Sequence, residues 1–550
     1  IVKCEHATRI RYDSPRDMNV PIVTPYFLDR ANDYYADKTG VIAHDGTEYT
    51  YAELTERVNR LSNVLVDFGV GQGDRVAVLS PNTHWCIEAM FATQQLGGVF
   101  VPLNYRLTPD DYEYLLDDCG AKAVIADYDY ADKLSGLRED APAEEFVAYK
   151  ADRVEGDWLD YDDLLSGASA EQPERPDIDE DDVASINYTS GTTGDPKGVV
   201  RTHRTDFFNA MTHAYNVGLR DDTVYLWTLP MFHVNGWGNM YTITGVGGTH
   251  VCQRAFDAED VFRRVRDYDV SYISGAPTVL NMLLEYNEEH DDFETTGDNP
   301  VTISTAGAAP PQATISAVED DLGWTIMHFY GHTESGPYTT SHSPTRIDEV
   351  GRMKIKPKQG MPSLGNRLRV VDEDGNDVPR DDETMGEIVM KGNLVFDRYW
   401  NKPEETEEAF HDRVDGWFHG GDLGTGDENG FITLKDRKKD IIVSGGENIS
   451  SLEIEDTIYD MPEVAKATVI PVPHDEWGET PKVFIVLKEG AELTEDDVIQ
   501  HCRDTLAHYK APSQVEFVQS LPETATGKVQ KHVLREQEWE DEDRLIGGGS

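Results

Sequence analysis

The segment Tyr188–Val200, YTSGTTGDPKGVV, combines hydroxyl side chains, three glycines and one lysine between two hydrophobic runs. Glycines allow the backbone to approach a ligand closely, and successive exposed N–H groups form an anion site. Hydroxyl groups can donate further hydrogen bonds, and a lysine can neutralise phosphate charge. These residue types indicate a phosphate-binding loop made by Thr189, Ser190, Gly191, Thr192, Thr193, Gly194 and Lys197.

This loop is not a Walker P-loop. That motif places its lysine between a glycine and a serine or threonine, whereas Lys197 follows Pro196 and precedes Gly198. On shape alone, a surface turn rich in glycine and threonine is an equal alternative, because short motifs give many false matches. The order of other motifs along the chain therefore has to decide between the two.

Strand and helix patterns alternate along the first third of the chain. Arg75–Ser80, Val99–Asn104 and Ala121–Asp127 are short apolar runs of strand length. Thr83–Gly97 and Thr108–Gly120 each open on a capping threonine and close on glycine, as helices do. This alternation predicts a parallel sheet covered by helices.

The same pattern recurs in the middle of the chain, where three apolar runs stop at small or polar residues: Asp269–Pro277, Val301–Pro310 and Thr325–Gly336. Ligands of such sheets gather at the carboxyl ends of the strands. A boundary is expected near Asp436–Ser451, since a segment of about a hundred residues follows, a reasonable size for a small domain. Ser450–Glu453 matches a capping box at the start of its first helix.

The charge of the chain limits its partners. Lys plus Arg number 49 and Asp plus Glu number 103, which gives a formal net charge of −54. This sign opposes non-specific binding to nucleic acid and to anionic membranes. The acidic residues are spread along the chain, which favours a solvated surface, and we hypothesise a cytosol of very high salt, as in halophiles.

The five cysteines are scattered without a CxxC pair, so neither a disulfide framework nor a zinc site is expected. No apolar run reaches the length of a membrane span, and residues 1–14 lack the apolar core of a signal peptide. The sequence therefore predicts a soluble, cytoplasmic protein.

Further motifs follow the phosphate loop in a fixed order. They are Ser304–Pro310 (STAGAAP), Tyr330–Ser335 (YGHTES), Gly416–Gly424 (GWFHGGDLG), Asp436–Ser450 (DRKKDIIVSGGENIS) and Thr524–Lys531 (TATGKVQK). Together they resemble the signatures of the adenylate-forming superfamily, which includes acyl-CoA synthetases, adenylation domains of peptide synthetases, and luciferases. The resemblance spans about Asp45 to Arg535. It implies an α/β fold with a large N-terminal domain of stacked α/β sheets (1–437) and a small α+β C-terminal domain (438–550), joined by a hinge.

The resemblance implies a reaction in two halves that uses ATP, Mg²⁺ and CoA. A carboxylate attacks the α-phosphorus of ATP to give acyl-AMP and pyrophosphate, and a thiol then attacks the acyl carbon and releases AMP. Positive charge must offset the repulsion between carboxylate and triphosphate, and Lys528 is expected to bridge them. Thr333 would contact the α-phosphate, and Glu334 with Thr189 would hold Mg²⁺, which prefers oxygen ligands.

The same resemblance assigns the nucleotide and CoA contacts. Asp422 would bind the ribose, Arg437 the ribose or a phosphate, and Lys439 would be the hinge. The adenine side would be formed by Gly307, Ala308, Ala309, Tyr330 and Gly331, and the thiol tunnel by Ser444, Gly445, Gly446 and Glu447.

The acyl side is expected in Leu229–Gly238, where His233, Val234 and Trp237 resemble the aromatic gate of fatty acyl-CoA synthetases. Small residues in Gly236–Gly248 would leave room for a chain, and this region has no charge suited to an amino-acid ammonium group. We therefore expect a fatty acid of medium to long chain, with an aryl or short-chain acid as the alternative. A carrier-protein loader, a non-catalytic nucleotide-binding relative and a luciferase-like oxidase stay open. Relatives are often homodimers, although no interface is recognisable in the sequence.

Overall fold

The computed structural model describes residues 19–189, 196–290, 294–307, 310–341, 356, 358–411, 413–445, 447–474, 477–523 and 529–539. Several residues expected to act in the site lie outside these ranges: Ser190, Gly191, Thr192, Thr193, Gly194, Ala308, Ala309, Gly446 and Lys528.

An eight-stranded sheet carries the phosphate-loop hairpin. Its strands lie in the order β19 (Arg398–Tyr399), β9 (Lys197–Thr202), β8 (Val183–Thr189), β4 (Val99–Leu103), β3 (Arg75–Leu79), β5 (Ala121–Asp127), β6 (Glu145–Tyr149) and β7 (Leu159–Asp160). Strands β4, β3, β5, β6 and β7 pair in parallel, which confirms the prediction from their alternation with helices. Strands β8 and β9 pair antiparallel, so the phosphate loop connects the two arms of a hairpin.

A seven-stranded sheet contains the strands that lead into the adenine segment, the Tyr330–Ser335 segment and the acyl segment. Its order is β14 (Thr325–His328), β13 (Thr302–Thr305), β12 (Tyr272–Gly275), β10 (Val224–Trp227), β11 (Thr249–Cys252), β1 (Thr39–Ile42) and β2 (Glu48–Thr50). The pairs from β14 to β10 are all parallel. Their carboxyl ends therefore meet at one edge, where the adenine segment, the Tyr330–Ser335 segment and the acyl segment begin.

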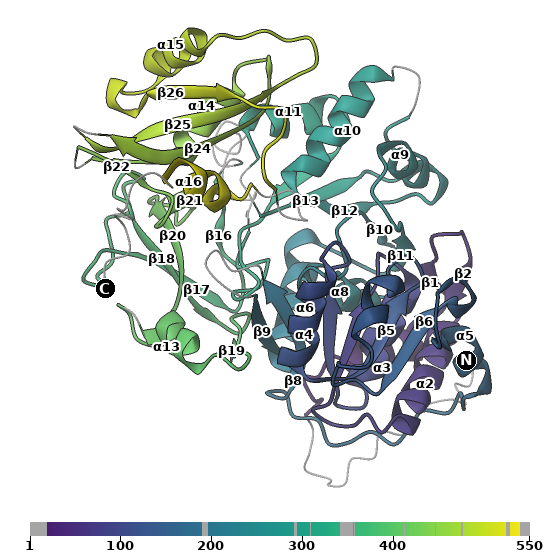
Figure 1. Cartoon of the computed structure of the whole chain (residues 1–550). Coiled ribbons are helices and arrows are strands. Elements are labelled where there is room, and N and C mark those ends of the chain that lie inside the picture. The colour runs from purple at the N-terminus through teal and green to yellow at the C-terminus, as the bar shows by residue number, and fades with distance from the viewer. Residues whose placement is uncertain are drawn as a thin grey trace.

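Helices fill the space between the two sheets and cover their outer faces (Figure 1). The inner helices are α1 (Tyr26–Tyr35), α2 (Tyr51–Asp67), α3 (His84–Gln94), α5 (Tyr161–Gly167), α6 (His203–Val217) and α8 (Asn239–Val246). The outer ones include α4 (Pro109–Cys119), α9 (Ala258–Asp267), α10 (Pro277–Glu289) and α11 (Gln312–Asp320). Every residue of α3 is buried, which explains its largely apolar sequence.

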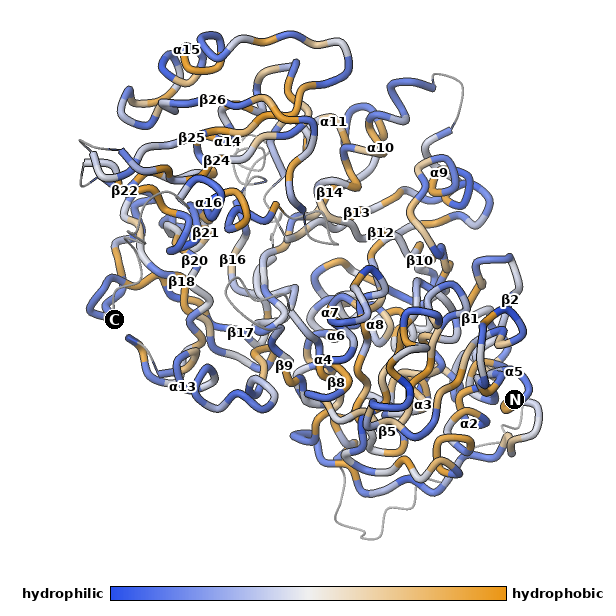
Figure 2. The backbone as a smooth tube through the Cα atoms, viewed as in Figure 1, coloured by the Kyte–Doolittle hydropathy of each residue, from blue (hydrophilic) through white to orange (hydrophobic). Residues whose placement is uncertain are grey.

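The sequence predicted the caps of the helices only in part. Thr108 caps α4 as expected, in a capping box with Asp111, and the helix ends at left-handed Gly120. Thr83 does not cap α3, because its hydroxyl lies 2.9 Å from that of Ser80 instead. Hydrophobic residues follow the strands and inner helices, whereas hydrophilic residues mark the surface loops (Figure 2).

The last third of the chain forms two smaller units. An antiparallel sheet contains β17 (Asn366–Val371), β18 (Gly386–Gly392), β20 (Phe418–Gly426) and β21 (Ile432–Arg437), with the short pair β15 (Thr340–Ser341) and β16 (Met361–Pro362) and helix α13 (Pro403–His411) nearby. The C-terminal unit contains β22 (Ile442–Ser444), β23 (Glu447–Ile449), α14 (Ser451–Tyr459), β24 (Val464–His474), β25 (Gly478–Leu487), α15 (Glu495–Thr505), β26 (Gln514–Phe517) and α16 (Lys531–Trp539).

The C-terminal unit has its own hydrophobic core, built from Ile442, Ile454, Val469, Val483 and Ile485 among others. The α/β fold with a large N-terminal part and a small α+β C-terminal domain is therefore confirmed. The boundary at residues 437 and 438 stays a prediction, and it falls between the last strand of one sheet and the first strand of the next. Within the described ranges, no helix is both long and apolar enough to cross a membrane.

Candidate active site

Asp422 forms the centre of the expected ribose end of the site. Its Oδ2 accepts a hydrogen bond from the Tyr330 hydroxyl at 2.8 Å and lies 2.7 Å from Nε2 of His332. Arg437 faces it across the β20–β21 pair, with Nε 3.3 Å from Oδ1. Two strands and the segment after β14 thus place one carboxylate among three donors.

This setting keeps Asp422 ionised. Burial opposes the charge, but His332, through its charge and its hydrogen bond, and Arg437 hold the pKa of the Asp422 carboxyl well below its usual range. Burial and the neighbouring Asp422 raise the pKa of Tyr330, so its hydroxyl stays a donor. An ionised carboxylate only accepts hydrogen bonds, as recognition of ribose hydroxyls requires.

The expected phosphate end is assembled around Tyr399. The Lys197 ammonium lies 5.0 Å from the centroid of the Tyr399 ring, and the Tyr399 hydroxyl donates to Glu334 Oε1 at 2.9 Å. Thr189 pairs with Lys197 across the hairpin, and its hydroxyl lies 3.4 Å from the Lys197 carbonyl oxygen. One row of contacts therefore joins the base of the phosphate loop to Glu334.

The donor set here suits Mg²⁺ that is held mainly by substrate. Among the residues that the structure describes, no group of three or more His, Cys, Asp or Glu side chains could hold a metal. Magnesium commonly uses one or two carboxylates together with phosphate oxygens and waters. Glu334 and the Thr189 hydroxyl fit that role as partners of ATP-bound Mg²⁺ rather than as a closed cage.

The acyl segment contains a left-handed turn that the sequence did not predict. Val234, Asn235, Gly236 and Trp237 have φ values of 50°, 54°, 60° and 56°. This conformation costs roughly 1–2 kcal/mol for each residue with a side chain, and a β-branched residue is rarely found there. Such strain persists only where the surroundings hold the backbone in place.

Amide side chains hold this turn from three neighbouring elements. Asn209 of α6 donates to the Trp237 carbonyl at 3.0 Å, and Asn187 of β8 donates to the Asn235 side chain at 3.1 Å. Asn82, after β3, accepts from the Met231 N–H at 2.8 Å just before the turn. The turn, which follows β10 of the seven-stranded sheet, is therefore fixed against the eight-stranded sheet and α6.

Trp237 lies in an apolar cluster next to the adenine segment. Its ring meets Tyr338 edge-on with centroids 6.3 Å apart, and the same cluster contains Leu229, Ala306 and Phe329. Ala306 directly precedes Gly307, so the acyl and adenine segments are in contact. His233 is half-buried and Val234 is buried at the start of the turn.

The prediction that small residues leave room for an acyl chain is wrong for four glycines of this region. A Cβ atom on any of them would lie within 2.5 Å of a neighbouring side chain: Trp227 for Gly236, Asn209 for Gly238, Phe27 for Gly245 and Tyr35 for Gly247. The small residues allow close packing of α8 and the turn rather than free volume.

The expected hinge is tied to the C-terminal helix. The Lys439 carbonyl accepts a hydrogen bond from Arg535 of α16, and the same guanidinium pairs with Asp440 at 2.7 Å. On the preceding strand, Asp436 Oδ2 accepts from the Ser451 N–H at 2.6 Å. Lys439 itself is exposed, and these contacts hold Asp436 before it and Asp440 after it.

The expected CoA segment forms a tight hairpin, in which Ser444 pairs with Glu447 across β22 and β23. Gly445 has φ of 60° and donates its N–H to the Trp477 carbonyl at 2.8 Å. A Cβ at Gly445 would lie 2.8 Å from the Trp477 ring, so this indole covers the glycine where a pantetheine arm was expected. The role of the segment in CoA binding stays a prediction.

The structure thus brings Thr189, Lys197 and Glu334 together, and separately Tyr330, Asp422 and Arg437. Gly331, the residue after Tyr330, is closely packed, because a Cβ atom there would lie 2.0 Å from the Gly336 carbonyl oxygen. Sequence reasoning missed His332, although it lies inside the Tyr330–Ser335 motif. It also missed Tyr399 and Asn235, whose contacts come from distant parts of the chain.

Comparison with known proteins identifies the family of the chain. Residues 28–400 match the family model of the AMP-binding enzymes, and residues 453–528 match the model of the C-terminal domain of AMP-binding enzymes. The two matches together cover both the large N-terminal part and the small C-terminal domain. The chain belongs to the AMP-binding enzyme family.

Similar proteins narrow the class further. The chain is 40% identical to a probable acyl-activating enzyme 5, peroxisomal, of Arabidopsis thaliana, over 95% of this chain and 97% of that one. It is 36% identical to 4-hydroxybutyrate–CoA ligase 2 of Metallosphaera sedula, over 94% of each. The crystal structure of ATP-bound MatB from Rhodopseudomonas palustris superposes with a TM-score of 0.83 at 32% identity, covering 94% of this chain and 99% of that one. The protein is an acyl-CoA ligase of this family, and ATP and CoA are the substrates that fit it.

Proposed function

We propose that this enzyme joins a short- to medium-chain aliphatic acid with an uncharged tail to CoA in two steps. The acid carboxylate attacks the α-phosphorus of ATP, forming acyl-AMP as the bond to pyrophosphate breaks. The CoA thiol then loses its proton and attacks the acyl carbon, forming the thioester as AMP leaves. Mg²⁺ bound through Glu334 would stabilise the charge on the phosphates.

The observation that carries this proposal is the row Lys197–Tyr399–Glu334 beside the Asp422 cluster. Lys197 can neutralise β- and γ-phosphate charge, and Thr333, one residue before Glu334, can reach the α-phosphate. Asp422 and Arg437 can hold the ribose at the other end. Glu334 and Asp422 both act on the charge of Arg437, so one nucleotide could contact both groups.

Lys528 is the proposed bridge between the carboxylate and the α-phosphate, and it lies outside the described residues. The residues on either side, Glu523 and Val529, pair as an antiparallel bridge. A point charge on a flexible stem suits this role, because it can enter for one step and withdraw for the next.

The charges around the acyl segment support an uncharged tail. Asp206, which contacts Asn235 of the acyl segment, pairs with Arg201 at 2.5 Å, and both side chains are buried. Neither charge is available for an ammonium group or a second carboxylate on the substrate. An amino acid or a diacid would therefore place an uncompensated charge in this region.

The packing supports a shorter acid than the sequence suggested. Gly236 and Gly238 are covered by Trp227 and Asn209, and Trp237 closes the segment within an apolar cluster. The similarity to a ligase named for 4-hydroxybutyrate agrees with this size. A medium- to long-chain fatty acid and an aryl acid are the alternatives.

A panel of acids tests the proposal. Purified enzyme with ATP, Mg²⁺ and CoA would receive straight-chain acids from about two to about sixteen carbons. Branched, aryl, amino and dicarboxylic acids would complete the panel. We expect acyl-CoA and AMP in equal amounts, with kcat/KM highest for short to medium uncharged tails. A maximum at the longest chains, or with an amino acid or diacid, would contradict the proposed substrate.

The acceptor thiol is tested in the same experiment. Acid-dependent exchange of pyrophosphate into ATP without acyl-CoA would mean that the acyl group goes to a carrier protein. Trp237→Ala should extend the accepted chain length if this indole limits the acyl site. An unchanged chain-length profile would remove Trp237 from that role.

A further inference from the structure

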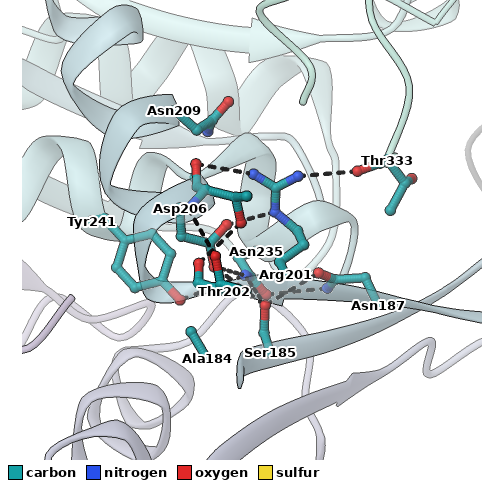
Figure 3. A network of polar contacts seen from close by, with 12 residues as sticks. Ala184, Ser185, Asn187, Arg201, Thr202, Asp206, Asn209, Asn235, Tyr241 and Thr333 are labelled. Atoms are coloured by element: carbon teal, nitrogen blue, oxygen red, sulfur yellow. Dashed lines mark hydrogen bonds and ion pairs between the residues drawn. The ribbon is translucent and has the colours of Figure 1, made fainter. Parts of the chain in front are cut away.

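One buried polar network connects three parts of the site that are distant in sequence (Figure 3). Arg201 of β9 donates from Nε to Asp206 Oδ1 at 2.5 Å and from Nη1 to the Thr333 carbonyl at 3.1 Å. Asp206 Oδ2 accepts from the Ser185 hydroxyl and from the Asn235 amide, both at 3.2 Å. Arg201, Asp206, Ser185 and Asn235 are all buried, with at most 2% of their surface exposed.

The network ends on the left-handed turn of the acyl segment. The Asn235 amide also donates to the Ser185 hydroxyl at 2.9 Å, and its carbonyl oxygen accepts from Asn187 at 3.1 Å. Asn235 itself has φ of 54° and ψ of 41°. Its side chain thus uses both oxygen and nitrogen to fasten a strained residue to strand β8, the first arm of the phosphate-loop hairpin.

The three connected parts have different proposed tasks. Strands β8 and β9 carry the phosphate loop, Thr333 would contact the α-phosphate, and Val234 and Trp237 flank the acid. Attack of a carboxylate on phosphorus requires these parts to hold their ligands about 3–3.5 Å apart and in line. A network that fixes all three to one hairpin can set that distance.

We propose that Arg201, Asp206 and Asn235 are positioning residues that fix the acyl-binding turn and the Thr333 loop on the phosphate-loop hairpin, so that carboxylate and α-phosphate meet in reacting geometry. This inference rests on the proposed adenylation at this site. The planar fork of Arg201 contacts Asp206 and Thr333 through two separate nitrogens, a fixed spacing that the single ammonium nitrogen of lysine does not provide. Asn235 combines tolerance of the left-handed region with a side chain that donates and accepts.

A purely structural network is the competing explanation, because buried polar groups stabilise a fold only when they are all paired. The two explanations differ in their kinetic consequences. A structural role lowers the melting temperature and leaves the folded enzyme with normal kinetics. A positioning role changes the kinetic constants of the folded enzyme in a pattern that depends on which part is released.

Two variants release different parts. Asn235→Gly keeps a residue that accepts the left-handed backbone and removes the side-chain anchors, so the acyl turn should loosen. We expect the KM for the acid to rise at least about tenfold in pyrophosphate exchange, with the KM for ATP within about twofold, since a small misplacement of the substrate is costly. Arg201→Lys keeps the charge beside Asp206 and loses the Thr333 contact. Here we expect kcat for exchange to fall at least about tenfold with the KM for the acid little changed.

A matched pair of serine variants separates positioning from stability. Ser185→Ala removes a hydroxyl of the network, and Ser62→Ala removes an equally buried hydroxyl of α2 that donates to the carbonyls of Val58 and Ala92 at 2.9 and 3.1 Å. Both should lower the melting temperature, but only Ser185→Ala should raise the KM for the acid. If Asn235→Gly does not fold, this pair decides the question.

The outcomes distinguish the two levels of the account. Wild-type enzyme that shows no acid-dependent exchange with any acid would overturn the proposed adenylation and this inference with it. Active wild-type enzyme whose Asn235→Gly, Arg201→Lys and Ser185→Ala variants match Ser62→Ala in all kinetic constants would overturn the inference alone. Kinetic changes confined to the network variants would support it.

Discussion

At the residue scale, Tyr399 joins the two charges on which the phosphate end depends. Its ring faces the Lys197 ammonium and its hydroxyl donates to Glu334 at 2.9 Å. The hydrogen bond orients one carboxylate oxygen of Glu334, while the ring stays beside the Lys197 ammonium. Tyr399 therefore orients the group expected to hold Mg²⁺.

Tyr399→Phe removes that hydrogen bond and keeps the ring. A hydrogen bond to a charged group contributes about 1.5–3 kcal/mol, so kcat/KM for exchange should fall about tenfold to a hundredfold. The Mg²⁺ concentration for half-maximal rate should rise as well. The exposed Tyr215 of α6 gives a control, and Tyr215→Phe should leave both values unchanged. An unaltered Mg²⁺ titration for Tyr399→Phe would contradict the role given to this hydroxyl.

Asp422 should leave a signature in the pH dependence of stability. Its pKa is lowered in the folded protein from about 3.9 in the unfolded chain, so the carboxylate stabilises the folded state fully above that value. This contribution is lost as pH falls through the folded pKa. The difference in unfolding free energy between wild type and Asp422→Asn should shrink as pH falls below about 4. Denaturant titrations between about pH 5 and pH 2 would show it, and a difference that grows over this range would contradict it.

Residues within recognisable motifs could be predicted from sequence, but their partners could not. Asp422 was named from its motif, whereas His332 was quoted in a motif without a role. Tyr399 belongs to no motif and reaches Glu334 only because β19 pairs with β9. Arg201 and Asn235 are connected through Asp206, and the three side chains come from different elements. No local pattern in the sequence specifies that contact.

At the element scale, the alternating strands and helices were well predicted, because apolar runs and glycine ends report directly on buried strands and helix termini. Strands β3, β4 and β5 begin at the expected residues. The left-handed turn at 234–237 was not predicted, since its backbone is set by distant anchors against local preference. The same turn explains why the small residues were misread as free space.

Gly236 tests this interpretation of the turn. It combines φ of 60° with a Cβ position 2.3 Å from the Trp227 ring, so Gly236→Ala should lower the free energy of unfolding by about 2–4 kcal/mol, from overpacking and backbone strain together. Gly218 has φ of 79° with no atom within 4 Å of a Cβ. Gly218→Ala should therefore lose only the backbone part, about 1 kcal/mol. Equal losses in denaturant unfolding would contradict the close-packing argument.

The connection at Lys439 makes a second prediction at this scale. Proline there fixes φ in a segment whose two neighbours are anchored, so the small domain should be restricted to one pose. Lys439→Pro should retain one half-reaction and lose most of the other, when exchange and thioester formation from supplied acyl-AMP are measured separately. Lys439→Ala, which changes the side chain without fixing the backbone, is the control. An equal loss of both half-reactions in the proline variant would refute the hinge.

At the scale of the whole molecule, the net charge of −54 dominates. Such a surface repels itself at low ionic strength, and salt at about 1 M screens charges beyond about 3 Å. We predict that the melting temperature rises by several degrees between about 0.1 and 2 M KCl. An equal osmolality of sucrose is the control for non-electrostatic effects. A melting temperature that does not rise with KCl would remove the high-salt hypothesis.

Location and assembly are further properties of the whole molecule that the sequence addressed only by expectation. The cytoplasmic location stays a prediction, and one similar enzyme of Arabidopsis thaliana carries the word peroxisomal in its name. The homodimer also stays a prediction. Both depend on signals or surfaces that the arrangement of the active-site edge does not specify.

The central claim is that this edge converts a carboxylic acid to acyl-AMP before CoA takes part. The most direct measurement is a single turnover of enzyme with ATP, Mg²⁺ and butyrate in the absence of CoA, quenched and analysed by mass. The account predicts one butyryl-AMP and one pyrophosphate for each active site, and conversion to butyryl-CoA and AMP when CoA is added. Products of ADP and phosphate, or AMP released without dependence on the acid, would contradict it.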